Sequence, residues 1–179
     1  MRRLGIVIAG VVLVLGAVAV FQIVLSSRDN ANVDGAAAAS GPGELQRDLG
    51  ARHLTAGEKT PTTGLTDPPT SGPHHPQLAT RDGVKLSDDQ ILQALELGDV
   101  ILFYDAPKPP AALRALQRDV TGPFDAEVAA AGQQVILARR PGVDGVTAAA
   151  WRRLLHARDA SDPQLRAFAE AWVGRGLRG

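Results

Sequence analysis

The proline-rich segment from Pro68 to Pro76, with two adjacent histidines, most strongly limits what this chain can fold into. Proline fixes φ and removes an amide donor, whereas glycine opens positive φ. Since the segment places Gly72 and two further prolines around the imidazoles, it cannot continue a helix or a central strand. We predict a stiff, extended loop that holds His74 and His75 in one place.

The N-terminal segment Leu4 to Leu25 contains no charged residue. About 20 apolar residues in a helix cross a bilayer core of roughly 30 Å. Because Arg2 and Arg3 precede the segment, the positive-inside rule places residues 1–3 in the cytoplasm and the remainder of the chain outside. The sequence thus predicts a single-pass transmembrane anchor over residues 4–25, followed by an extracytoplasmic domain.

A cleaved signal peptide is the competing interpretation of the same segment. Ala17 and Ala19 provide a small-x-small cleavage site. The apolar run continues beyond this site to Leu25, whereas an export signal usually has a core of about 7–15 residues. The length of the run therefore favours an uncleaved anchor.

The composition argues against a disulfide-bonded protein or lipoprotein and against a nucleic-acid-binding protein. The chain of 179 residues has no cysteine, so neither a disulfide nor a lipid-modified cysteine can support the domain. Its 19 basic and 19 acidic residues are interspersed, whereas a nucleic-acid-binding protein needs a clustered basic face. We expect no nucleic-acid partner.

Residues 26–50 are rich in small and turn-forming residues, which is typical of a flexible linker. We expect one domain over residues 51–179, and its first part, Arg52 to Leu78, to be mainly loop. Regular structure is predicted from Ser87, which forms a capping box with Gln90 and precedes a helix that Gly98 terminates.

The remaining elements predict a small α+β domain with a short mixed sheet and packed helices. Val100 to Tyr104 and Val135 to Ala138 are apolar runs without polar alternation, as in strands that are covered on both faces. Val146 to Ala157 fits either a helix or a strand. The other expected features are a helix after Pro109-Pro110, a last helix from Asp162 to Gly174, and core positions for Trp151, Phe168 and Trp172.

With these features in order, the chain resembles a bacterial membrane-anchored family, domain of unknown function 3105. The strongest match is the loop Pro68-Pro69-Thr70-Ser71-Gly72-Pro73-His74, which agrees with the hallmark of the family residue by residue. The second is Gln93-Ala94-Leu95-Glu96-Leu97-Gly98, where the family usually reads His-x-Leu-Glu-His-Gly. A weaker match is Ala149-Ala150-Trp151. The resemblance implies a location at the bacterial cell membrane.

The second motif departs from the family at the two positions that matter chemically. Two histidines four residues apart share a helix face and can converge on one metal ion. Here these positions are Gln93 and Leu97. Leucine cannot bind a metal, and a glutamine amide oxygen is a poor ligand for transition metals. Glu96 alone remains of the helical half of the site.

Four groups are left that can bind a metal: His53, His74, His75 and Glu96. One interpretation is a residual site for Zn²⁺ or another divalent transition metal; the other gives these residues structural roles. The sequence favours a non-catalytic envelope protein without a cofactor, whose outer domain binds an envelope protein or the cell wall. A metal-binding domain is the alternative. An enzyme comes third, because no activated nucleophile or metal-bound water is evident.

Overall fold

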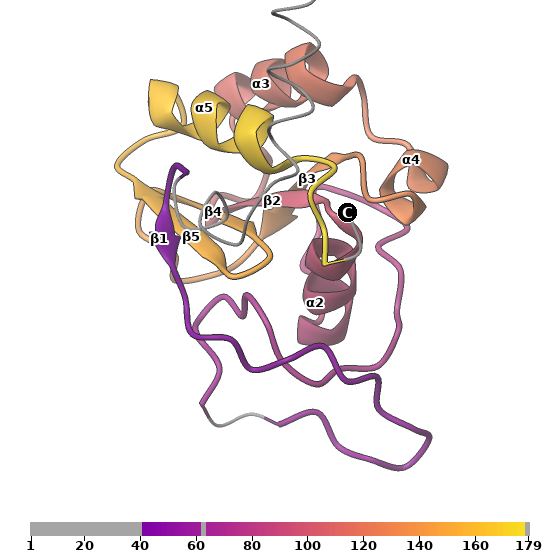
Figure 1. Ribbon diagram of the computed structural model, residues 1–179. Helices are drawn as coiled ribbons and strands as arrows, with labels where there is room; N and C mark the ends of the chain where they lie inside the picture. Colours follow the sequence, from indigo (N-terminus) through magenta and orange to yellow (C-terminus); the bar gives the residue numbers. More distant parts are fainter. Residues whose placement is uncertain (1–40, 62–63, 178–179) are drawn as a thin grey trace, which may run out of the picture. The chain divides into compact units, whose positions relative to one another are not determined.

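The computed structural model describes residues 41–61 and 64–177 of the chain (Figure 1). They belong to a compact unit that begins at Gly41. The predicted anchor over residues 4–25 lies outside the described residues. Within residues 41–61 and 64–177, every helix is too short or too polar to cross a membrane.

A five-stranded mixed sheet forms the centre of the domain, with the strand order β1-β5-β4-β2-β3. The pair β2 and β3, at the end of the sheet opposite β1, is parallel, and all other neighbouring strands are antiparallel. The strands are β1 (Glu44–Leu45), β2 (Val100–Tyr104), β3 (Val135–Arg139), β4 (Val146–Ala150) and β5 (Arg153–Ala157).

Helices cover both faces of this sheet (Figure 1). Helices α3 (Ala111–Thr121) and α5 (Pro163–Trp172) lie on one face, and α2 (Asp88–Leu97) lies on the other, with the short α4 (Ala126–Ala130) beside it. Successive side chains of β2 point alternately into these two layers, since Leu102 packs under α3 and α5 and Ile101 packs under α2. Two covered faces explain why the strand is apolar throughout.

The predicted α+β class is confirmed, as are the capping box of Ser87 with Gln90 and the left-handed Gly98 at the end of α2. The ambiguous segment Val146 to Ala157 is a β-hairpin, β4 paired antiparallel with β5. Its burial on the sheet decides between the two patterns. Phe168 and Trp172 are core residues as predicted, and Trp151 is partly buried against the α2 side of the core.

Part of the predicted linker belongs to the compact unit. Residues 44 and 45 form the edge strand β1, and the indole Nε1 of Trp172 donates a hydrogen bond of 2.9 Å to the carbonyl of Pro42. Gly43 allows this close approach, because a Cβ there would lie 2.6 Å from the Phe168 ring. The small residues that suggested a flexible linker are thus packing positions in this part of the chain.

The proline-rich loop docks on the segment that precedes it. Ser71 is 2% exposed, and its hydroxyl donates to the carbonyl of Arg47 and accepts from the amide of Leu49, both at 3.1 Å. The amide of Gly72 then donates to the carbonyl of Gly50 at 2.8 Å. These three hydrogen bonds hold the two irregular segments side by side.

Replacing Ser71 with alanine should destabilise the domain by about 1 kcal/mol, because the partly buried amide of Leu49 and carbonyl of Arg47 each lose a hydrogen bond. Urea unfolding of the full-length protein, followed by tryptophan fluorescence, measures this loss. Ser161→Ala is the matched control, since Ser161 is exposed, and it should change stability by less than about 0.5 kcal/mol. Equal effects of the two variants would contradict the docking role of Ser71.

Asp99 links the end of α2 to the start of the sheet. Its side chain is buried, with 1% of the residue exposed, and Oδ1 accepts a hydrogen bond of 2.8 Å from the amide of Gln134. Burial raises the pKa of this carboxyl to about 8, against the opposing effect of the Gln134 amide. The folded protein thus keeps a proton that the unfolded chain loses near the ordinary aspartate pKa of about 3.9.

Between roughly pH 4 and pH 8 the unfolded state binds fewer protons at Asp99 than the folded state, so stability falls as pH rises through this range. Asp99→Asn keeps an acceptor for Gln134 but does not titrate. The difference in unfolding free energy between the two proteins should therefore change with pH, by up to about 1.4 kcal/mol per unit. Urea unfolding of both proteins at pH 5 and pH 8 measures it; a difference that is constant with pH would disprove the raised pKa.

Candidate functional site

The docking of the two loop segments brings two histidines together. His53 and His74 form an isolated parallel bridge, in which the amide of His74 donates to the carbonyl of Arg52 and the amide of Leu54 donates to the carbonyl of His74. The two imidazole rings lie edge to face, with their centroids 5.2 Å apart. Backbone pairing, and not closeness in sequence, makes them neighbours.

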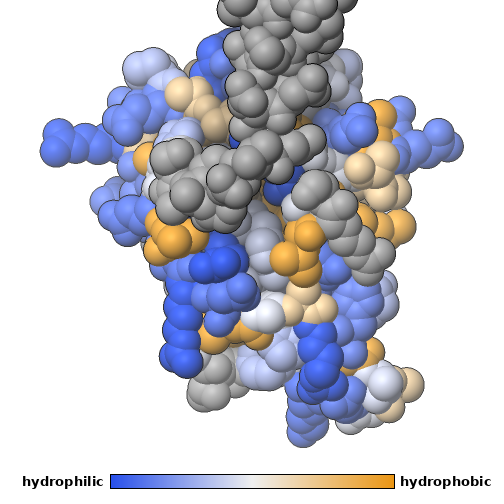
Figure 2. All heavy atoms as spheres, viewed as in Figure 1, coloured by the Kyte–Doolittle hydropathy of each residue, from blue (hydrophilic) through white to orange (hydrophobic). Residues whose placement is uncertain are grey.

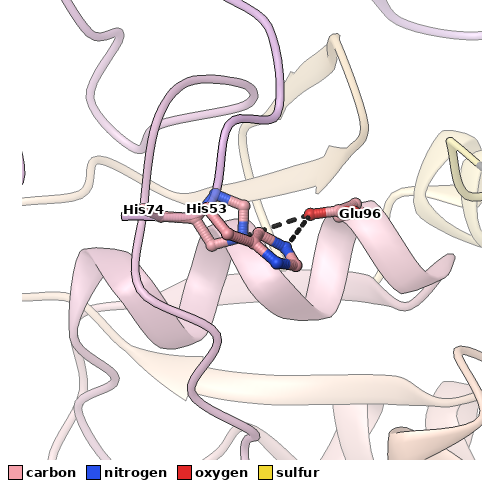
Figure 3. Close-up of side chains that lie close together, drawn as sticks. All are labelled: His53, His74 and Glu96. Atoms are coloured by element: carbon pink, nitrogen blue, oxygen red, sulfur yellow. Dashed lines mark hydrogen bonds and ion pairs between the residues drawn. The ribbon is translucent and has the colours of Figure 1, made fainter. Parts of the chain in front are cut away.

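Helix α2 supplies a carboxylate to the same place. Both imidazoles point to the side chain of Glu96 (Figure 3). Nε2 of His53 lies 3.0 Å from Glu96 Oε2, and Nε2 of His74 lies 3.3 Å from the same oxygen. Each of the three residues offers a ligand atom within 4.8 Å of the other two. The structure thus brings together three of the four predicted site residues.

His75 does not join this cluster. Its Nε2 lies 3.1 Å from the carbonyl oxygen of Glu58, and its amide donates to Asp89 Oδ1 at 2.9 Å. Neighbouring residues of an extended segment point to opposite sides. Because His74 faces α2, the ring of His75 is directed to the outer loop instead.

The site is buried on one side and open on the other. The side chain of His74 is fully buried, and that of Glu96 is 4% exposed, whereas that of His53 is 37% exposed. Burial of a carboxylate is costly unless a proton, a cation or hydrogen-bond donors compensate its charge. His53 is thus the solvent-facing wall of the site.

The tautomer of His74 follows from a backbone contact. Its Nδ1 lies 2.9 Å from the carbonyl oxygen of Gly72, which can only accept a hydrogen bond. Nδ1 therefore carries a proton, and a neutral ring presents the lone pair of Nε2 to Glu96. Within the described part of the chain, this Nε2 has no partner with hydrogen-bond geometry.

The two positions that lack the family histidines differ in their surroundings. Gln93 is 5% exposed, and its Oε1 has no hydrogen-bond partner among residues 41–61 and 64–177. Leu97 is only partly buried. The sequence motif indicates a lost ligand at Gln93, and no local pattern shows that its amide oxygen is buried without a hydrogen-bond partner.

A separate hollow of about 540 Å³ lies near the start of α2, with Lys85 and Arg140 in its wall. Arg140 is engaged by carboxylates there: its Nε donates to Asp67 Oδ1 at 2.6 Å, and one terminal nitrogen lies 3.3 Å from Asp88 Oδ1. Since the positive charges face two carboxylates in the same wall, the hollow has no excess charge that would select an ionic ligand.

The cluster of His53, His74 and Glu96 has the donor atoms that divalent transition metals prefer. Ligand atoms of a tetrahedral site with bonds of about 2.0–2.2 Å lie roughly 3.3–3.6 Å apart. The His74–Glu96 separation, 3.3 Å, lies at the lower end of this range, and the His53–Glu96 separation, 3.0 Å, is about 0.3 Å shorter. The residues present therefore fit a metal ion, and they equally fit a hydrogen-bonded ion pair.

Comparison with known proteins identifies the family. A family model described as "Protein of unknown function (DUF3105)" matches residues 56–177, which include the proline-rich loop, α2 and the whole sheet except β1. No curated protein and no solved structure matches the chain. His53 lies just before the matched range, whereas His74 and Glu96 lie within it. The match covers more than half of the chain, which therefore belongs to the DUF3105 family of proteins of unknown function.

Proposed function

We propose that the domain binds a divalent transition metal ion, such as Zn²⁺, through His53, His74 and Glu96. One observation carries this proposal: His74 Nε2 and the buried Oε2 of Glu96 lie 3.3 Å apart, while Nδ1 of the same ring is engaged by the Gly72 carbonyl. In the neutral ring, Nε2 and Oε2 are two acceptors that repel each other in a medium of low dielectric constant. A cation between them removes the repulsion.

The surroundings of His74 support this proposal. Histidines that bind metals usually donate their second ring N–H to a carbonyl or carboxylate, which fixes the tautomer and the ring orientation. The Gly72 carbonyl occupies this place at Nδ1 of His74. The exposed edge of His53 provides a path for the ion from solvent.

A proton is the alternative to a metal ion. If His74 is an imidazolium, its Nε2–H donates to Glu96 and the cluster is an ion pair that fastens the loop to α2. The same three residues would then serve stability alone. The two functions differ in whether the purified protein holds metal in proportion to His74.

The test compares two adjacent histidines in the full-length protein. His74→Ala should abolish stoichiometric Zn²⁺ binding because it removes the buried ligand, whereas His75→Ala should keep it because His75 faces the Glu58 carbonyl. Elemental analysis after dialysis against Zn²⁺, with isothermal titration calorimetry, measures both variants against the natural sequence.

His53→Ala provides a second test in case His74→Ala, which alters a buried position, does not fold. Its side chain is 37% exposed, so its removal should spare the fold while it weakens Zn²⁺ binding by tenfold or more. Far-UV circular dichroism confirms folding. An absence of Zn²⁺ in the natural protein, or equal Zn²⁺ affinity in all four proteins, would sink the proposal.

We further propose that the domain lies outside the bacterial membrane, held by residues 4–25, and that its role is binding without a catalytic step. The apolar run behind Arg2 and Arg3 supports this location. An envelope protein or the cell wall is the proposed partner.

On the face in Figure 2, hydrophobic residues form small groups among hydrophilic ones. The exposed large apolar residues of the described part are Leu45, Leu78, Val84 and Leu177.

Protease treatment of spheroplasts tests the location. A C-terminal tag on the full-length protein should be found in the membrane fraction and should be destroyed by added protease, because the anchor leaves the C-terminus outside. A control that lacks residues 4–25 should stay soluble and protected inside the cell. A protected tag on the full-length protein would refute the proposed orientation, and a shortened, soluble external product would identify a cleaved signal peptide.

A further inference from the structure

Gln93 is the second buried polar group that lacks a partner near the candidate site. The residue is 5% exposed, and Oε1 makes no hydrogen bond to any residue that the structure describes. Leaving a buried amide oxygen unsatisfied costs about 1–3 kcal/mol. Such a group in a well-packed domain indicates a ligand or water at that position.

The geometry of α2 places Gln93 on the helix face that the proline-rich loop contacts. Asp89, Gln93 and Glu96 follow at spacings of four and three residues, so they share one face of the helix. The proline-rich loop runs along this face: the amide of His75 bonds Asp89 Oδ1 at 2.9 Å, and His74 Nε2 lies 3.3 Å from Glu96 Oε2. Gln93 lies between these two contacts.

Two atoms without hydrogen-bond partners, Gln93 Oε1 and His74 Nε2, therefore lie on the same side of α2 under one loop. Both atoms have lone pairs, and neither is satisfied by the other, because two acceptors cannot share a hydrogen bond. A cation satisfies both lone pairs and attracts the Glu96 carboxylate, whereas a water could donate its two hydrogens only to the two acceptors.

We infer that Gln93 Oε1 is the fourth ligand of the metal site, an inference that rests on the metal-binding function proposed above. The complete set is then two imidazole nitrogens, one carboxylate oxygen and one amide oxygen, from His53, His74, Glu96 and Gln93. An amide oxygen is a weaker ligand for zinc than imidazole, and its neutral oxygen suits harder ions such as Mn²⁺ better.

A fourth protein ligand closes the site. Catalytic zinc sites keep three protein ligands and a water, whereas structural sites have four protein ligands. With Gln93 bound, no coordination position is left for an activated water in a tetrahedral site. The ion then fastens the proline-rich loop to α2, which agrees with a role in binding without catalysis.

Cobalt(II) reports on this geometry, because its visible spectrum depends on coordination number and on the ligands. The full-length protein and Gln93→Met, which keeps the side-chain length without the oxygen, are titrated with Co²⁺ and then with azide. Gln93→Met should bind Co²⁺ roughly ten- to a hundredfold more weakly. Azide should change the spectrum of this variant, because the missing amide oxygen leaves a coordination position open. The natural protein should show no azide effect.

Gln164→Met is the matched control, since Gln164 is an exposed glutamine of helix α5, and it should behave as the natural protein. Gln93→Glu keeps an oxygen at the same position and should hold or raise the Co²⁺ affinity, which provides a test if Gln93→Met does not fold. A loss of affinity in Gln93→Glu would overturn the inference.

Unchanged affinity and spectrum in Gln93→Met would also overturn the role of Gln93 while leaving the three-ligand site intact. Failure of the proposed function looks different. In that case the natural protein binds no Co²⁺ or Zn²⁺, or His74→Ala binds them as well as the natural protein does.

Discussion

The burial of strand β2 on both faces is the constraint from which the other elements take their places. Its alternating side chains need an apolar layer above and below the sheet, which α3 and α5 provide on one side and α2 on the other. At about 25 cal/mol per Å² of apolar surface, this burial is the main stabilising contribution. Because only the tight Gly98 and Asp99 connection separates α2 from β2, the position of the strand also determines where Glu96 lies.

The second constraint is electrostatic and joins the irregular half of the domain to the regular half. A carboxylate with 4% of its surface exposed lies between the sheet layer and the proline-rich loop, and two imidazoles reach it from that loop and the segment beside it. The loop is held independently by Ser71 and by backbone hydrogen bonds, so its histidine is oriented before any ion binds. Preorganised donors of this kind lose little conformational entropy when a ligand arrives.

Gln93 stands where the family motif usually has a histidine. From the sequence motif alone, this replacement removes a metal ligand. In the folded protein the glutamine is buried on the face of α2 that the loop covers, and its oxygen is unsatisfied there. A polar group in such a place is either a cost to stability or part of a site, and the neighbouring unpartnered nitrogen of His74 favours a site.

The sequence alone determined the elements that depend on local interactions. The cap at Ser87, the left-handed Gly98 and the proline start of α5 all involve contacts within about four residues, so their signals lie side by side in the chain. The strand Val100 to Tyr104 was recognisable from its uninterrupted apolar run, although its pairing partners are distant. The sequence also identified the three residues that meet, within a set of four candidates. Only the tertiary structure decided which residues converge. The pairing of His53 with His74 sets which of two adjacent histidines faces α2, and burial on the sheet turns Val146 to Ala157 into a hairpin. These outcomes depend on contacts between residues distant in sequence, and no local pattern records them.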